Sequence, residues 1–312
     1  MTKGMITRRE AARLIGTAAA ATLLPAGTED IFGAAASSGM LTRAIPSTGE
    51  RLPVIGLGSA VTFDVRSGPI KPLEEVLSLF VKRGGKIIDT SPMYGQAESV
   101  IGNLATKLRL HNSLFVATKV WTNGKQEGLA MMDRSFSRLQ TQKIDLMQVH
   151  NLVDIDSQMG SVRDLKSKGR IRYTGITHSE ARGFGEVEKA MRTHKPDFVQ
   201  INYSLVERGA AQRILPLAHD MRMGVIVNRP LGGGAVLKTI SSKPLPPWAA
   251  EFDCHSWPQF LLKWILAHPA VTCVIPATNN PQHLEDNMAA GLGRLPDAKT
   301  RERMASLFVG FS

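Results

Sequence analysis

Three ionisable side chains and one tyrosine stand where they could share a proton-transfer site. Asp89, Lys119 and His150 each end a short, β-branched apolar run. Tyr94 lies five residues past Asp89, in a stretch rich in turn-forming residues. Because a buried charge at a strand end is costly without partners, three such groups at equivalent positions indicate one shared polar site. The alternative is three independent capping or salt-bridge residues.

Tyr94 and Lys119 form a combination suited to donating a proton at neutral pH. An unperturbed tyrosine has a pKa of ~10 and therefore stays protonated. A nearby ammonium group stabilises the phenolate that remains after donation. Asp89 could hold Lys119 by a charge-assisted hydrogen bond. His150 could donate to an oxygen that gains charge.

Short apolar runs of strand length alternate with longer amphipathic stretches along the chain. The expected strands are 52–57, 86–89, 114–119, 145–150, 171–176, 198–201, 225–228 and 272–275. The expected helices are 73–83, 97–110, 128–139, 158–168, 180–193, 211–222, 258–267 and 281–289. Eight such alternations predict an α/β fold, a single (β/α)8 TIM barrel, with functional side chains at the C-terminal strand ends. The longest irregular stretch, 231–257, is expected on that catalytic face.

Composition narrows the class of protein. The chain is 43% hydrophobic and 21% charged, which excludes a wholly disordered protein. Two cysteines exclude a disulfide-dense scaffold, and the 8 histidines lack paired ligand spacing, so no metal site is expected. A disulfide between Cys254 and Cys273 is disfavoured because Cys273 lies in a predicted buried strand. The net charge of +11 permits nucleic-acid binding, but 6% aromatic residues make no stacking platform.

The first 36 residues resemble a cleavable twin-arginine-type signal. Arg8 and Arg9 precede a weakly apolar run over 14–24, and small residues occupy 34–36. The run is about half the ~20 residues that span a bilayer, so no stable membrane span is expected. The alternative is an amphipathic helix that stays on a cytoplasmic protein.

Export by the twin-arginine machinery would leave a periplasmic or otherwise exported barrel of residues 37–312, cleaved near Ala36. Residues 1–36 carry four basic and three acidic side chains, so ten of the eleven net charges belong to the barrel. This excess suits the phosphates of a dinucleotide.

One stretch links these residues to a known family. It reads Ile87-Ile88-Asp89-Thr90-Ser91-Pro92-Met93-Tyr94-Gly95, followed by Ala97-Glu98 and Ile101-Gly102. With Lys119 and His150 it resembles the aldo-keto reductase superfamily, from about residue 52 to 287. The resemblance implies hydride transfer between a nicotinamide and an aldehyde, ketone or alcohol, with Tyr94 as the proton donor. NADP(H) is favoured and NAD(H) is possible.

The resemblance also implies a set of cofactor-binding residues. They are Gly58, Ser59, Thr177, His178, Gln200, Asn228, Arg229, Leu231, Gly233, Ala277, Thr278, His283, Asp286 and Asn287. Asn228 cannot supply the aromatic face that many members stack on the nicotinamide. Ala277 and His283 replace the Lys and Arg that grip the 2′-phosphate in many members. The glycine-rich turn 229–234 could approach phosphates closely, or be only a flexible loop.

Two other functions remain as alternatives. One is a non-catalytic, nicotinamide-binding regulatory barrel, against which the complete set of four site residues argues. The other is an aldolase or isomerase that uses Lys119 as its nucleophile. Trp121 and Trp248 are apolar candidates for substrate contact, or satellite core residues.

Overall fold

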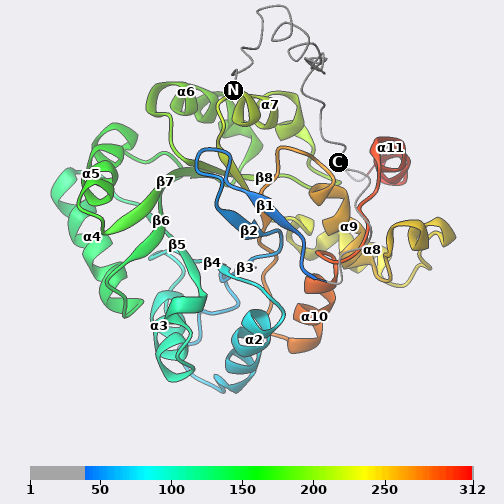
Figure 1. The fold of residues 1–312 in the computed structure, drawn as a ribbon, viewed down its shortest axis with the longest axis horizontal. Helices are drawn as coiled ribbons and strands as arrows, with labels where there is room; N and C mark the ends of the chain where they lie inside the picture. The colour runs from blue at the N-terminus through cyan, green and yellow to red at the C-terminus, as the bar shows by residue number, and fades with distance from the viewer. Residues whose placement is uncertain (1–38, 311–312) are drawn as a thin grey trace, which may run out of the picture. The chain divides into compact units, whose positions relative to one another are not determined.

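Eight short parallel strands form a ring in the computed structural model, which describes residues 39–310 (Figure 1). Neighbours in the ring follow the chain order, from β3 to β10. The strands are β3 (Leu57–Gly58), β4 (Ile87–Asp89), β5 (Phe115–Val120), β6 (Ile144–His150), β7 (Ile171–His178), β8 (Phe198–Asn202), β9 (Gly224–Asn228) and β10 (Cys273–Val274). Bridges from Ile55 to Val274 and from Gly58 to Ala277 join the first segment to the last. The predicted (β/α)8 barrel is confirmed.

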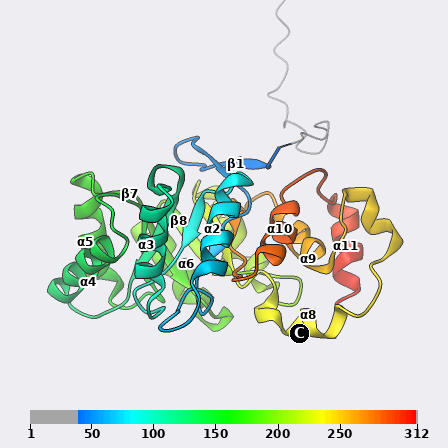
Figure 2. The same cartoon turned by 90° about the horizontal axis from the view of Figure 1, so that it is seen from below.

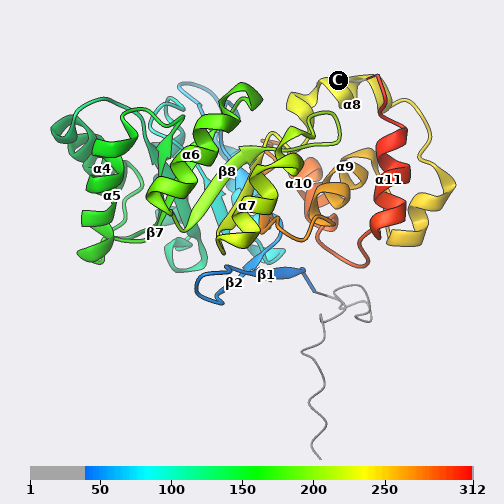
Figure 3. The ribbon, with the colours of Figure 1, turned by 90° about the horizontal axis from the view of Figure 1, so that it is seen from above.

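Helices surround the ring (Figures 1 and 3). Those in the predicted places are α2 (Lys71–Lys82), α3 (Ala97–Lys107), α4 (Lys125–Arg138), α5 (Ile155–Ser167), α6 (Phe184–His194), α7 (Ile214–Asp220), α9 (Trp257–Leu266) and α10 (Pro281–Ala289). The 3-10 turns η2 (Ala181–Gly183) and η3 (Gly209–Gln212) replace the starts of the predicted helices 180–193 and 211–222, whereas α3 ends three residues before its predicted end and the turn η1 (His111–Ser113) follows it. The sequence did not predict α8 (Ala235–Ile240) or α11 (Ala298–Ser306), nor the turns η4 (Gly232–Gly234) and η5 (Pro247–Phe252).

The predicted first strand, 52–57, is wrong as one element. Its first part belongs to β2 (Arg51–Pro53), which pairs antiparallel with β1 (Thr42–Ala44) outside the barrel. Only Leu57 enters a barrel strand, β3. Both parts are apolar and buried, so the run looks continuous although the chain changes direction within it. Pro53 lacks an N–H group, which helps to end the hairpin ladder.

The β1–β2 hairpin covers the barrel end opposite to α8 (Figures 2 and 3). Inside the barrel, Phe115, Tyr173 and Phe198 form an aromatic cluster with ring centroids 5.5–6.3 Å apart. Phe115 and Phe198 are the first residues of β5 and β8, so the cluster fills the N-terminal half of the barrel. The polar strand ends at the other half are therefore free to line a site.

Within residues 39–310, no helix is long and apolar enough to cross a membrane. The predicted signal segment, residues 1–36, lies outside the described residues.

Candidate active site

A buried ion pair lies at the C-terminal ends of β4 and β5. The Lys119 Nζ donates to Asp89 Oδ1 at 2.7 Å and to the Thr90 carbonyl at 2.7 Å. The second carboxylate oxygen of Asp89 accepts from Gln148 Nε2 at 3.2 Å. Lys119 and Asp89 are only 1% and 3% exposed. The pair is thus desolvated, and its charges are met by protein groups.

Burial alone would lower the pKa of Lys119. Asp89 and Tyr94 oppose that effect, and together they raise the pKa above its ordinary value. The side chain is therefore an ammonium group at neutral pH. Its Nζ lies 5.0 Å from the centroid of the Tyr94 ring, close enough to stabilise a negative charge on the phenol oxygen.

Tyr94 and His150 reach the same space from different elements. Tyr94 follows β4 in a turn that the Tyr94 N–H closes onto the Ser91 carbonyl at 3.0 Å, whereas His150 is the last residue of β6. Their rings meet edge to face, with centroids 6.1 Å apart. The pKa of His150 is lowered to about 3, first by burial and then by Lys119 and His178. The imidazole is therefore neutral at pH 7.

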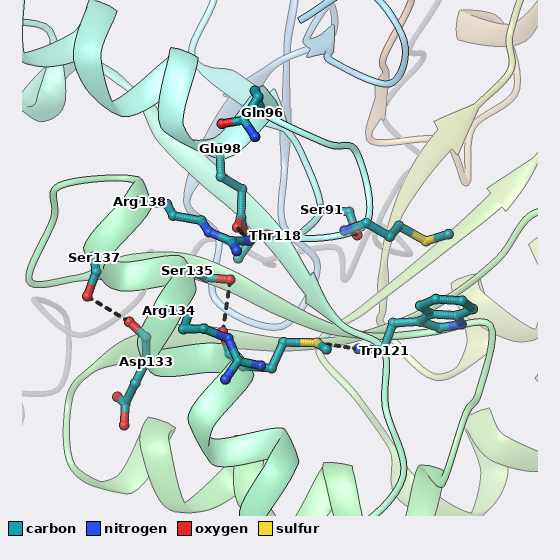
Figure 4. A network of polar contacts seen from close by, with 12 residues as sticks. Ser91, Gln96, Glu98, Thr118, Trp121, Asp133, Arg134, Ser135, Ser137 and Arg138 are labelled. Atoms are coloured by element: carbon teal, nitrogen blue, oxygen red, sulfur yellow. Dashed lines mark hydrogen bonds and ion pairs between the residues drawn. The ribbon is translucent and has the colours of Figure 1, made fainter. Parts of the chain in front are cut away.

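Glu98 is buried behind this cluster, on the outer side of β5. Its carboxylate accepts from Thr118 Oγ1 at 2.7 Å and lies 3.5 Å from Arg138 Nη1 (Figure 4). Burial raises the pKa of Glu98, while its polar partners partly oppose this. Glu98 therefore joins α3 to α4 and to β5, where its partner Thr118 directly precedes Lys119. Glu98 does not line the cavity described below.

A cavity of about 780 Å³ opens at this end of the barrel. Asp89, Tyr94 and His150 line it, and Lys119 lies behind Asp89 and Tyr94. Twelve of the fourteen predicted cofactor residues also line it: Gly58, Ser59, Gln200, Asn228, Arg229, Leu231, Gly233, Ala277, Thr278, His283, Asp286 and Asn287. The structure thus brings together residues from both ends of the chain around one space.

Within residues 39–310, four buried polar atoms on the cavity wall lack a hydrogen-bond partner. They are Ser59 Oγ, Asn151 Oδ1, Gln200 Nε2 and Asn228 Oδ1. Leaving a buried donor or acceptor unpaired is costly, so such atoms point to a polar ligand that pairs with them. The donor on Gln200 and the acceptor on Asn228 suit a group carrying both a carbonyl and an amide N–H, such as the carboxamide of nicotinamide.

Residues 54–303 match the aldo/keto reductase family. The chain belongs to this family. It is 27% identical to a methylglyoxal reductase of Escherichia coli, over 76% of this chain and 85% of that protein. It is 24% identical to a probable aldo-keto reductase of Glycine max, over 77% and 82%.

Solved structures of aldo-keto reductases share the fold. One from Klebsiella pneumoniae, in complex with NADP and acetate, has a TM-score of 0.72 at 23% identity, covering 85% of this chain and 94% of that one. The holo form of one from Bacillus halodurans has a TM-score of 0.69 at 22% identity, covering 86% and 96%.

In this aldo/keto reductase the glycine-rich turn after β9 has an unusual backbone. Arg229, Gly232, Gly233 and Gly234 all have positive φ, between 47° and 85°. Glycine tolerates this region, but Arg229 does not adopt it readily, so the surrounding structure must hold it there. The exposed Arg229 side chain lies beside Gly233. Such a turn presents N–H groups together with a cation, which suits a diphosphate.

At the far end of the cavity, Asp286 is already held by α9. Its two carboxylate oxygens accept from Ser256 Oγ, both at 2.8 Å, and Oδ1 also accepts from Gln259 Nε2 at 2.7 Å. Thr278 Oγ1 accepts from the Asn280 N–H at 3.1 Å, while Ala277 and His283 are exposed. Arg229 is the one Lys or Arg among the described cavity-lining residues.

Two predicted cofactor residues do not line the cavity. Thr177 is 1% exposed and stands in register between His150 and Gln200. The His178 ring packs against Gly183, and its Nδ1 accepts from the Glu180 N–H at 3.1 Å. Trp121 is 42% exposed and lies outside the cavity lining, and Trp248 packs with Phe252 and Phe260 as a satellite of the core.

Sequence reasoning missed Val61, Met93 and Asn151, which all line the cavity. Asn151 has a φ of +50°. In the sequence, only its position directly after His150 indicated that it could line the site. Cys254 and Cys273 are both buried free thiols. Among residues 39–310, no cluster of His, Cys, Asp or Glu is arranged to hold a metal ion.

Proposed function

We propose that this chain reduces a small aldehyde or ketone, or oxidises the corresponding alcohol, with NAD(P)(H) and with Tyr94 as the proton donor. One observation carries the proposal. Tyr94 and His150 share a single cavity wall with the unpartnered polar atoms of Ser59, Gln200 and Asn228. The first two residues suit a carbonyl oxygen and the other three suit a nicotinamide carboxamide. The name of the methylglyoxal reductase relative supports a small carbonyl substrate.

Each residue of the site has a separate role in the proposed reduction. A bound nicotinamide would supply the hydride, which no side chain can deliver. Tyr94 gives its phenolic proton to the carbonyl oxygen, and the Lys119 ammonium stabilises the phenolate that remains. Asp89 fixes the position of Lys119. His150, neutral at pH 7, orients the substrate by donating a hydrogen bond to the same oxygen.

We propose NADP(H) as the favoured cofactor, with NAD(H) as a second cofactor that the site accepts. Solved neighbours carry NADP or NADPH, and Arg229 can pair with phosphate. Because Ala277 is apolar and no Lys or Arg other than Arg229 lines the described cavity, a 2′-phosphate gains little here. We therefore infer a modest preference, which titration of both cofactors would measure.

Two alternatives receive less support. A Lys119-based aldolase or isomerase needs a neutral amine facing its substrate, but Lys119 is a buried ammonium bound to Asp89 and the Thr90 carbonyl. A non-catalytic, nicotinamide-binding barrel has no need of the complete Asp89, Tyr94, Lys119 and His150 cluster.

We also propose that the protein leaves the cytoplasm by twin-arginine export and is cleaved near Ala36. The support is the pattern of Arg8, Arg9 and the apolar run after them. Replacing both arginines by lysine should leave the uncleaved precursor inside the cell. Export and trimming of that variant would reject the proposal.

The reductase proposal is tested on the purified barrel. We expect fluorescence titration to show binding of NADPH, and a panel of small aldehydes and ketones to be reduced at its expense. The absence of nicotinamide binding would overturn the proposal. Binding without turnover on any carbonyl would favour the regulatory alternative.

A further inference from the structure

The buried Ser91 contacts His150 at Nδ1, the ring nitrogen that is not proposed to contact the substrate. Ser91 is 0% exposed, and its Oγ lies 3.3 Å from His150 Nδ1. The contact crosses 59 residues of sequence, from the loop after β4 to the end of β6. The other ring nitrogen, Nε2, has no hydrogen-bond partner among the described residues, and His150 lines the cavity.

The hydrogen bonds of Ser91 fix which atom carries the proton. The backbone N–H of Met93 points at Ser91 Oγ from 3.4 Å, and an N–H can only donate. The hydroxyl oxygen is thus an acceptor there, and its own hydrogen needs a different acceptor. His150 Nδ1 is the one such acceptor recorded for it in the described part of the chain. A protonated Nδ1 would leave the buried O–H without a partner, at a cost of about 1–3 kcal/mol.

We infer that Ser91 is a positioning residue: its hydroxyl donates to His150 Nδ1 and so holds the neutral imidazole in the tautomer that carries its proton on Nε2. This inference rests on the proposed function for its consequence, because only that tautomer can donate from Nε2 to a carbonyl oxygen. Because the pKa of His150 is lowered to about 3, the ring is neutral at pH 7 and its tautomer decides which nitrogen donates. An imidazolium would donate from both nitrogens, but a neutral ring donates from one.

The tautomer can be measured without substrate or cofactor. Two-bond ¹H–¹⁵N spectra of protein labelled at histidine distinguish a protonated Nε2 from a protonated Nδ1, and His150→Gln assigns the signals by their loss. We expect wild type to show the Nε2–H form, and Ser91→Ala to shift His150 toward a mixture. Ser91→Thr, which restores the hydroxyl, should return the wild-type pattern. A protonated Nδ1 in wild type, or an unchanged pattern in Ser91→Ala, would overturn the inference.

A matched control separates this effect from the loss of any buried hydroxyl. Ser161 on α5 is also 0% exposed, but its Oγ donates to the Ser157 carbonyl of its own helix at 3.2 Å. Ser161→Ala should leave the His150 signals and the rate unchanged. In carbonyl reduction, Ser91→Ala should lower kcat by about 5- to 10-fold, the equivalent of one hydrogen bond, with little change in KM.

The two proposals fail separately. A wild-type Nε2–H signal in a protein that reduces no carbonyl would reject the proposed function and leave the role of Ser91 standing. Carbonyl reduction by a protein with a protonated Nδ1 would reject the role of Ser91 alone.

Discussion

Lys119 and Lys263 are both buried ammonium groups, yet they lie in different chemical surroundings. Lys119, at the end of β5, is paired with the carboxylate of Asp89. Lys263, on α9, has two acceptors in the described part of the chain, the carbonyls of Leu292 and Arg294, at 2.7 and 2.8 Å. The pKa of Lys119 is raised, whereas burial lowers the pKa of Lys263 to about 8.

The difference shows that burial alone does not make a lysine functional. Asp89 keeps Lys119 charged beside Tyr94 and the cavity, where its charge can act on a reaction. The Lys263 ammonium binds two carbonyls and so joins α9 to the loop after α10. Lys263 does not line the cavity. One lysine therefore lies beside the candidate active site, and the other joins two parts of the fold.

The largest expected effect is on turnover. Lys119→Met removes the charge that stabilises the Tyr94 phenolate, so kcat should fall by at least about 10²-fold. Lys263→Met should keep kcat within about threefold. Steady-state kinetics on both folded variants measures the contrast. Equal losses in the two variants would show that the distinction between the lysines is wrong.

The next effect is on the free energy of unfolding. Lys119→Met leaves Asp89 charged, buried and without its cation, which should cost about 3–5 kcal/mol. Adding Asp89→Asn should recover part of that loss. Lys263→Met leaves two carbonyls unpaired but also removes a desolvated charge, so we expect a cost of about 1–3 kcal/mol. Urea unfolding at pH 7 compares all three variants. If the losses in the free energy of unfolding from Lys119→Met and Asp89→Asn simply add in the double variant, Lys119 and Asp89 are not energetically coupled.

The contributions of Lys263 and Lys119 to stability should change with pH in opposite directions. Between about pH 8 and 10.5 the unfolded chain keeps a proton on Lys263 that the folded chain has lost. Wild type should therefore gain stability relative to Lys263→Met as pH rises through that window, by up to about 3 kcal/mol. The raised pKa of Lys119 gives the opposite sign, because its contribution is present below pH 10.5 and is lost above it. Unfolding curves at pH 7.5, 9 and 10.5 test the sign for Lys263, and curves above pH 10.5 test the sign for Lys119.

The smallest expected effect concerns His150. A histidine acid with an ordinary pKa would make kcat/KM for reduction fall as pH rises through about 6.5. Because the pKa of His150 is about 3, its ring is neutral throughout pH 5–8, and it should add no such fall. His150→Gln, which keeps a hydrogen-bond donor, should show the same shape at a lower rate. A histidine-like step present in wild type and missing in His150→Gln would contradict this account.

The sequence predicted most of the barrel and the grouping of the four site residues, since the C-terminal ends of parallel strands meet at one face. It did not predict the role of Lys263, because the two carbonyls that cap it lie about thirty residues later in the chain. The hairpin over the barrel end was missed because the apolar run at Leu52 shows no change of direction. Unpartnered atoms, such as Asn151 Oδ1, become visible only when every neighbour has a position.

We propose that Tyr94 gives the proton in a site that binds nicotinamide independently of it. The direct test is Tyr94→Phe, with cofactor affinity measured by fluorescence titration and turnover measured on the best carbonyl substrate of wild type. We predict NADPH affinity within about threefold of wild type and a loss of kcat of at least about 10²-fold. Wild-type turnover in Tyr94→Phe would contradict the claim.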